Sequence, residues 1–164
     1  MTWKIKKLDA IDFINYYSPN YIGVTTLMTS ATWNTAATHE VFTVTGLVHF
    51  RFWIECTATL TDAADGASMQ VGYDADTDFF ITTTAVATAG ASLLATGCLF
   101  YDATPDLVPP TFVAGSFNHI INGYDIGYEI TGAALTGGSL TWHCVWEPLN
   151  STGLVTAGAG GVLV

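Results

Sequence analysis

Positive charge is almost missing from this chain. Among its 164 residues there are four Lys and Arg against fourteen Asp and Glu, so the formal net charge is −10 at pH 7. Proteins that bind nucleic acid neutralise phosphates with clustered Lys and Arg. The composition therefore predicts no nucleic-acid partner.

Cysteine is also scarce. Cys56, Cys98 and Cys144 are widely spaced and form no CxxC pair, which excludes a zinc knuckle or a thioredoxin-type site at the level of motifs. Each lies in a strand-like run, so we expect buried thiols that behave as small hydrophobic groups. A disulfide between Cys56 and Cys144 is the alternative.

Long apolar runs are absent, although 50% of the residues are hydrophobic. No run reaches the ~20 residues of a spanning helix, and Asp9 and Asp12 interrupt the basic start, which argues against a secretory signal. We therefore expect no membrane partner.

Charged residues make up only 11% of the chain, where about 25% is usual. Two interpretations remain. One is a well-packed monomer covered by Thr, Ser, Asn and Gly, and the other is a homo-oligomer that buries apolar surface against partners. We favour the homo-oligomer, because a monomer would have few solubilising groups other than its Asp and Glu.

What the sequence has in abundance is period-two alternation, which is typical of half-buried β-strands. Between Leu47 and Leu60, every second residue is apolar: Val48, Phe50, Phe52, Ile54, Cys56, Ala58 and Leu60. The segments Tyr124–Thr131 and Leu140–Glu147 alternate in the same way. Weaker strand signals cover Gly23–Met28, Glu40–Thr45, Ala67–Tyr73, Phe79–Thr84, Leu93–Tyr101 and Thr111–Phe117.

Turn residues separate these runs. Asp65-Gly66, Asn122-Gly123 and Gly137-Gly138 are typical hairpin turns, and one short helix is expected within Ala10–Tyr17. The pattern predicts an all-β fold, an antiparallel β-sandwich of the jelly-roll type with about eight strands. The predicted divisions are an N-terminal arm over 1–22, a sandwich over 23–149 and a C-terminal arm over 150–164.

The two predicted arms differ in character. Three of the four basic residues lie in the first seven positions, and all fourteen carboxylates follow them. The C-terminal arm is Gly-rich and uncharged, so it is either an untethered end or an arm that orders on a neighbouring subunit. The candidate partner-contact residues are Trp3, Lys4, Ile5, Lys6, Lys7, Leu154, Val155, Val162, Leu163 and Val164.

Catalytic motifs are absent: there is no GxSxG, no HExxH, no phosphate loop and no dinucleotide fingerprint. We predict no enzyme, no catalytic residue and no cofactor. Five Trp, seven Tyr and nine Phe are many for this length. Those outside the strong alternations either cover the ends of the sandwich or anchor an interface, with carbohydrate stacking as a third use.

One spacing suggests a metal. Asp74, Asp76 and Asp78 alternate as calcium-binding carboxylates can, but Phe79 and Ala85 occupy the positions where an EF-hand needs Gly and Glu. A generic calcium site is the weaker interpretation, and a solvated acidic loop is the stronger one. On the polar face of the strand over 47–60, His49, Arg51 and Glu55 predict a structural ion pair.

Three passages resemble small virion structural proteins of tailed bacteriophages. They are VFTVTGLVHFRFWIECTATLTDAADGASMQVGYDADTDFFITTT, INGYDIGYEITG and GGSLTWHCVWEPLN, and the likeness spans residues 40–153. The resemblance implies a β-rich capsid decoration (cement) protein, commonly a trimer. Such a protein contacts the major capsid protein on the capsid exterior after assembly in the host cytoplasm. The alternatives are a receptor- or glycan-binding module of a head or tail fibre, and a tail or connector component.

Overall fold

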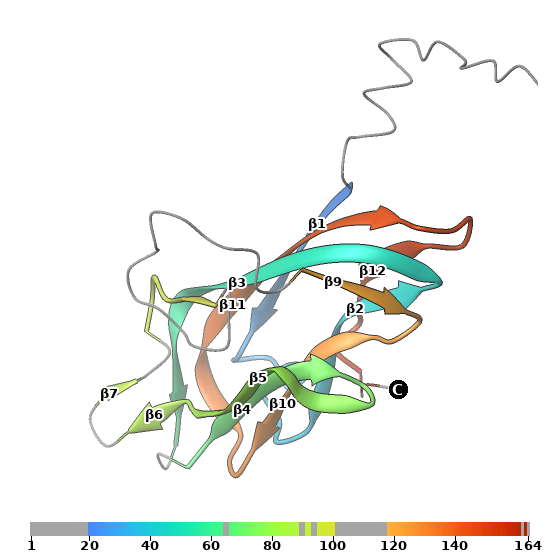
Figure 1. Cartoon of the computed structure of the whole chain (residues 1–164). Helices are drawn as coiled ribbons and strands as arrows, with labels where there is room; N and C mark the ends of the chain where they lie inside the picture. Colours follow the sequence, from blue (N-terminus) through green and yellow to red (C-terminus); the bar gives the residue numbers. More distant parts are fainter. Residues whose placement is uncertain are drawn as a thin grey trace, which may run out of the picture.

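The computed structural model describes residues 20–63, 66–88, 91–92, 95–100, 118–161 and 163. They form two packed antiparallel sheets, as Figure 1 shows. The expected helix within Ala10–Tyr17 and the expected strand at Thr111–Phe117 lie outside the described residues. The strands are β1 (Asn20–Leu27), β2 (Thr38–Thr45), β3 (Leu47–Asp62), β4 (Ser68–Tyr73), β5 (Asp76–Ala85), β6 (Ala87–Thr88), β7 (Ala91–Ser92), β8 (Leu99–Phe100), β9 (Asn118–Asn122), β10 (Ile126–Thr131), β11 (Leu135–Pro148) and β12 (Leu154–Ala157).

Sheet I has the order β1-β11-β3, and β8 and β9 pair with successive parts of the free edge of β3. Sheet II has the order β12-β2-β10-β4-β5. The short strands β6 and β7 pair only with each other among the described residues.

The predicted jelly roll is confirmed by the pairing of the strands. With β12 and the two-residue strands left aside, the first strand pairs with the last, β1 with β11. The same nesting pairs β2 with β10, β3 with β9 and β4 with β5. Such a nested set, rolled into two sheets, is the jelly-roll arrangement.

The alternation of β3 confirms which face is buried. Val48, Phe50, Phe52, Ile54, Cys56 and Leu60 are all buried. Ala58 is the exception and is exposed, because the register with β11 shifts between Ser139, which faces Ala58, and Leu140, which faces Cys56.

The predicted hairpin turns are wrong. Asn122-Gly123 does form a tight turn, with Gly123 at φ 72°, but it leads from β9 in sheet I to β10 in sheet II. The segment containing Asp65-Gly66 likewise connects β3 to β4 in the other sheet. Gly137 and Gly138 lie inside β11 at its bulge. In a jelly roll most strands that pair are distant in sequence, so a turn between consecutive strands usually connects one sheet to the other.

The predicted C-terminal arm is wrong over its described part. β12 pairs with β2, placing Val155 opposite Val44, and Val155 and Leu163 are buried. The backbone continues beside β2, where Glu40 N–H donates to the Gly161 carbonyl at 2.8 Å. Without this tail β2 would present an unpaired edge, and glycines allow the close approach.

The N-terminal boundary also moves. β1 begins at Asn20 and pairs with Trp146 from that residue on, so residues 20–22 belong to the sandwich. Trp3, Lys4, Ile5, Lys6, Lys7, Val162 and Val164 lie outside the described residues.

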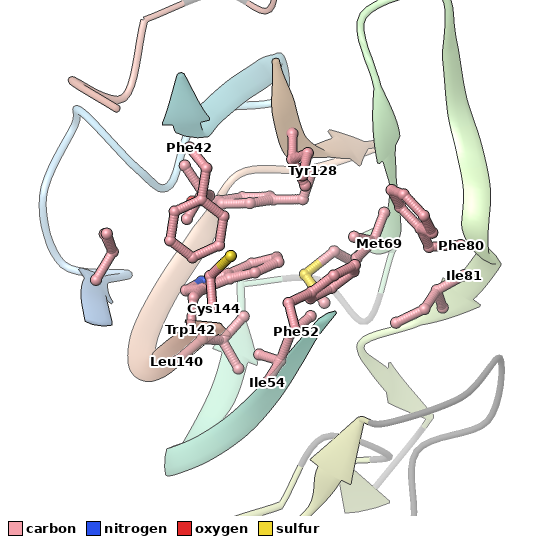
Figure 2. Packing of buried hydrophobic residues seen from close by; sticks show 14 of the residues in the cluster. Phe42, Phe52, Ile54, Met69, Phe80, Ile81, Tyr128, Leu140, Trp142 and Cys144 are labelled. Carbon is pink, nitrogen blue, oxygen red and sulfur yellow. The ribbon is translucent and has the colours of Figure 1, made fainter. Parts of the chain in front are cut away.

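The core fills the space between the sheets, as the close view in Figure 2 shows. The Trp142 ring of β11 stacks on Tyr128 of β10, with ring centroids 5.4 Å apart. The polar atom of each side chain also forms a hydrogen bond. The Trp142 indole N–H donates to the Thr26 hydroxyl at 3.2 Å, and the Tyr128 hydroxyl donates to the Trp33 carbonyl at 2.7 Å. This pair ties the two sheets together.

Candidate functional site

A groove lined mainly by aromatic side chains opens where an edge of sheet I meets an edge of sheet II. Its volume is about 330 Å³. β9 supplies one wall, and the hairpin of β4 and β5 supplies the other. We call it the aromatic groove, and its lining residues are Phe50, Tyr73, Phe79, Phe80, His119, Ile120, Ile121, Asn122 and Tyr124.

The jelly roll explains why these residues meet. β9 and β5 are both last in their sheets, so each presents one edge without a neighbouring strand among the described residues. Phe80 points inward and forms the floor, with its ring centroid 5.0 Å from Phe52 and 5.1 Å from His119. The floor is therefore continuous with the hydrophobic core and holds the groove in shape.

The upper part of the groove is exposed. Phe79 is 50% exposed, Ile120 65% and Tyr124 44%. Ring contacts hold the two aromatic side chains in place: Tyr73 lies 5.2 Å from Phe79 and 5.3 Å from Tyr124, centroid to centroid. Apolar side chains that are both exposed and fixed are typical of binding surfaces, because burying them costs little conformational entropy.

Acidic residues border the aromatic groove. Asp74 follows Tyr73, Asp78 precedes Phe79, and Asp125 follows Tyr124 in the sequence. The backbone N–H of Asp74 donates to the Asp125 carbonyl at 3.3 Å, which joins the two loops that carry these carboxylates. The Val44 N–H of β2 donates to Oδ1 of Asp125 at 2.8 Å, so that carboxylate is engaged on β2. We call the three carboxylates of the β4–β5 hairpin, Asp74, Asp76 and Asp78, the acidic rim.

The rim carboxylates are electrostatically crowded. The hydrogen bond that protonated Asp76 donates to the Asp78 carboxylate raises the pKa of Asp76 above its usual value, and partial loss of water and the charge of Asp78 add to the effect. Burial raises the pKa of Asp74, and the nearby charge of Asp125 adds to the effect. One oxygen of Asp74 is buried with no hydrogen-bond partner. The rim therefore favours an approaching cation.

The calcium interpretation of Asp74, Asp76 and Asp78 is wrong. The described residues contain no group of three or more His, Cys, Asp or Glu side chains that could hold a metal ion. Asp76 and Asp78 come together on one face of β5, but Asp74 in the two-residue loop before it does not join them in such a group.

We expect Asp74→Asn to raise the free energy of unfolding at pH 7 by less than about 1 kcal/mol. Folding raises the pKa of Asp74, so the ionised carboxylate is disfavoured in the native state above that pKa. The gain should shrink as the pH falls through the folded-state pKa, because the wild-type carboxyl then becomes neutral as well. Urea denaturation at several pH values measures it. The control is Glu147→Gln, which removes the same charge from the exposed end of β11. An equal rise in the free energy of unfolding in this control would show that the effect does not come from the surroundings of Asp74.

A second cluster lies on the outer face of sheet I. The Tyr21 hydroxyl is 2.7 Å from Nδ1 of His143, and Nε2 of His143 is 3.7 Å from a Glu55 oxygen. Trp53 stacks on the His143 ring at 4.9 Å. Glu55 therefore pairs with His143 of the neighbouring strand, so the partners predicted on its own strand, His49 and Arg51, are wrong. Both partners are partly exposed, and such an ion pair contributes about 0–1 kcal/mol.

The predicted burial of the cysteines is confirmed, and the alternative disulfide between Cys56 and Cys144 is wrong. All three cysteines are free and buried. Burial raises the pKa of Cys56 to about 11 and that of Cys144 to about 12. The reactive form of a thiol is the thiolate, so these two side chains are unsuited to nucleophilic chemistry.

We expect Cys56 and Cys144 to react with iodoacetamide at pH 8 at least about 100-fold more slowly in the native protein than in urea, because only unfolding exposes them. Mass spectrometry of the labelled peptides measures each site separately. Native rates close to the rates in urea would contradict the buried positions.

Sequence reasoning missed the aromatic groove. Tyr124 fits the alternation of the following strand and was predicted to be in the core, yet it lies before β10 and is exposed. His119 belongs to β9, which was not predicted. The adjacent pair Phe79-Phe80 carried a usable signal, because two successive strand residues point to opposite faces and cannot both enter one core.

Comparisons with known proteins identify no relative: no family model, no curated protein and no solved structure matches this chain. Within the part of the chain that the structure describes, no helix is long and apolar enough to cross a membrane.

Proposed function

We propose that this protein is a non-enzymatic structural component of a bacteriophage virion, a capsid decoration (cement) protein. It would act as a homo-oligomer, a trimer, that binds the major capsid protein on the capsid exterior. The observation that carries the proposal is the aromatic groove, an exposed and fixed apolar surface on a body with few charges. The resemblance of residues 40–153 to phage virion proteins supplies the phage setting.

The chemistry of the groove favours contact over catalysis. Its lining is mostly Phe, Tyr and Ile, which contribute about 25 cal/mol for each Å² of apolar surface that a partner covers. Aromatic side chains are also enriched among the residues that dominate protein interfaces. Jelly rolls occur in viral capsid domains and in lectins, so the fold is compatible with the proposal without deciding it.

Weak contacts suffice for such a protein. A trimer presents three copies of each contact, and linked binding raises the effective concentration of the second and third contacts. Decoration therefore needs one modest apolar surface per subunit.

We expect Phe79→Ala to weaken binding of the full-length protein to phage particles that lack it by about 10-fold or more, because interface aromatics often contribute above 1 kcal/mol. Co-sedimentation over a range of protein concentrations measures the binding. Leu27→Ala is the matched control, since Leu27 is 53% exposed on β1, at the edge of sheet I away from the groove. Unchanged binding of the Phe79 variant would contradict the proposal.

A glycan-binding module of a head or tail fibre is the second candidate. The observation that favours it is the combination of exposed aromatic rings with polar groups at the groove, the Tyr124 hydroxyl and the Asn122 amide. A glycan array probed with the full-length protein separates the two functions. A sugar ligand whose binding is lost in Tyr124→Ala would support the glycan module, and particle binding without any sugar ligand would support decoration.

A further inference from the structure

The aromatic groove has a charge pattern that restricts its partner. Its lining is mostly apolar, whereas the hairpin that forms one wall carries Asp74, Asp76 and Asp78, and the last two carboxylates crowd each other. Among the described residues the only Lys or Arg is Arg51, which lies on β3. A fitting partner therefore combines apolar side chains with closely spaced positive charges.

One segment of this chain has that composition. Residues 3–7 read Trp-Lys-Ile-Lys-Lys, so the remaining three basic residues of the protein stand next to a Trp and an Ile. We call residues 1–19, which lie outside the described residues, the leader. No other stretch of the sequence contains two basic residues within ten positions.

We infer that the aromatic groove of one copy binds the leader of a second copy, with Trp3 and Ile5 among the aromatic side chains and the lysines against the acidic rim. This inference rests on the proposed function and deepens it, because it names the contact that holds the oligomer together. A change in the groove then weakens particle binding through loss of the trimer, whose three copies bind the capsid jointly. The formal charges match in sign, since three lysines meet the three carboxylates of the rim, although Asp9 and Asp12 reduce the net charge of the whole leader to +1. Each exposed ion pair contributes little alone, so the apolar side chains provide the affinity and the charges provide the selection.

The strand register explains why a second copy is the partner. Across sheet I, Asn20 faces Trp146, Trp146 faces Phe50, and Phe50 faces His119. The leader is thus attached at the same level of the sheet as the groove, at the opposite edge. When copies lie side by side, the point where the leader of one copy joins β1 lies next to the groove of the following copy. A repeated contact of this head-to-tail kind gives a ring, such as a trimer, when the rotation between successive copies closes, and an open filament when it does not.

The leader is also long enough. Twelve residues separate Lys7 from Asn20, and in extended form they span about 40 Å. The width of sheet I from β1 to β9 is three strand spacings, about 14 Å. A contact with the neighbouring copy is therefore within reach.

Charge reversal in the full-length protein tests the inference. The leader variant carries Lys4→Glu, Lys6→Glu and Lys7→Glu, and the rim variant carries Asp76→Lys and Asp78→Lys. Sedimentation velocity without any virus particle measures self-association. We expect each variant alone to associate at least 10-fold more weakly than the wild type. An equimolar mixture should recover association in part, because a ring of three built from two kinds of copy has two complementary contacts and one repulsive contact. The control, Glu55→Lys with Glu147→Lys, changes as many charges on the outer face of sheet I and should associate normally.

Three results would overturn the inference. They are a wild-type protein that stays monomeric at all concentrations, reversed variants that associate normally, and weakened variants whose association does not increase at all on mixing, which would place the leader in the groove of its own chain. A variant carrying both reversals in one chain guards against misfolding, because it should associate normally. Since no particle is involved, failure here is distinct from failure of the decoration function.

Discussion

Replacing Trp142 with alanine should lower the free energy of unfolding by about 3–5 kcal/mol. Trp142 is fully buried and is the largest side chain between the sheets. Its loss removes the stacking on Tyr128 and leaves the buried Thr26 hydroxyl without the indole N–H. Because small domains are stable by only about 5–15 kcal/mol, this one change removes much of the total.

Urea denaturation followed by far-ultraviolet circular dichroism measures the loss. Trp53→Ala is the matched control, because Trp53 is a half-buried tryptophan on the outer face of sheet I that stacks only on His143 among the described residues. We expect that control to lose about 1 kcal/mol. Equal losses in the two variants would contradict the assignment of Trp142 to the centre of the core.

Replacing Gly72 with alanine should lower the free energy of unfolding by about 3 kcal/mol. An added Cβ would overlap the Asp76 carbonyl oxygen and lie 2.5 Å from the carbonyl carbon of Thr77. Both obstacles are backbone, so the hairpin of β4 and β5 itself must shift. Gly72 of β4 faces Gly127 of β10, where an added Cβ would overlap the His39 carbonyl oxygen of β2. This pair of glycines therefore lets four strands of sheet II approach closely at one level.

The same substitution should disturb the aromatic groove, because the displaced hairpin carries Tyr73 and Phe79. We expect weaker particle binding in Gly72→Ala even at temperatures where the variant is folded. Gly161→Ala is the control, since an added Cβ there meets nothing within 4 Å, and its stability should stay within about 0.5 kcal/mol of the wild type. A Gly72 variant as stable as this control would contradict the close strand approach.

The sequence was informative wherever one residue pattern determines one local structure. The alternation of β3 and β11 has a period of two, which only a strand with one buried face produces, so the sandwich and most of its core were predictable. The short strand β9 was missed because Asn-His-Ile-Ile-Asn contains one apolar pair and no sustained alternation. The tail was misread as an arm because its glycines suggest freedom, whereas here they allow close contact with β2.

The candidate site was not predictable in the same way. Its aromatic residues come from β3, β4, β5, β9 and the turn before β10, and only the nested pairing of the jelly roll brings them together. Turn residues gave no help with that pairing, since the Gly-Gly pair lies in a bulge and Asn122-Gly123 joins two sheets. The charge distribution, in contrast, could be predicted from the sequence. The basic residues lie near the start and the acidic residues follow them, and this order along the chain does not depend on the fold.

Electron cryomicroscopy of phage particles assembled with and without this protein tests the central claim most directly. The account predicts extra density on the capsid exterior in groups of three, with each aromatic groove covered by a segment of a neighbouring subunit. Particles that never contain the protein, or that hold single copies whose grooves face solvent, would contradict it.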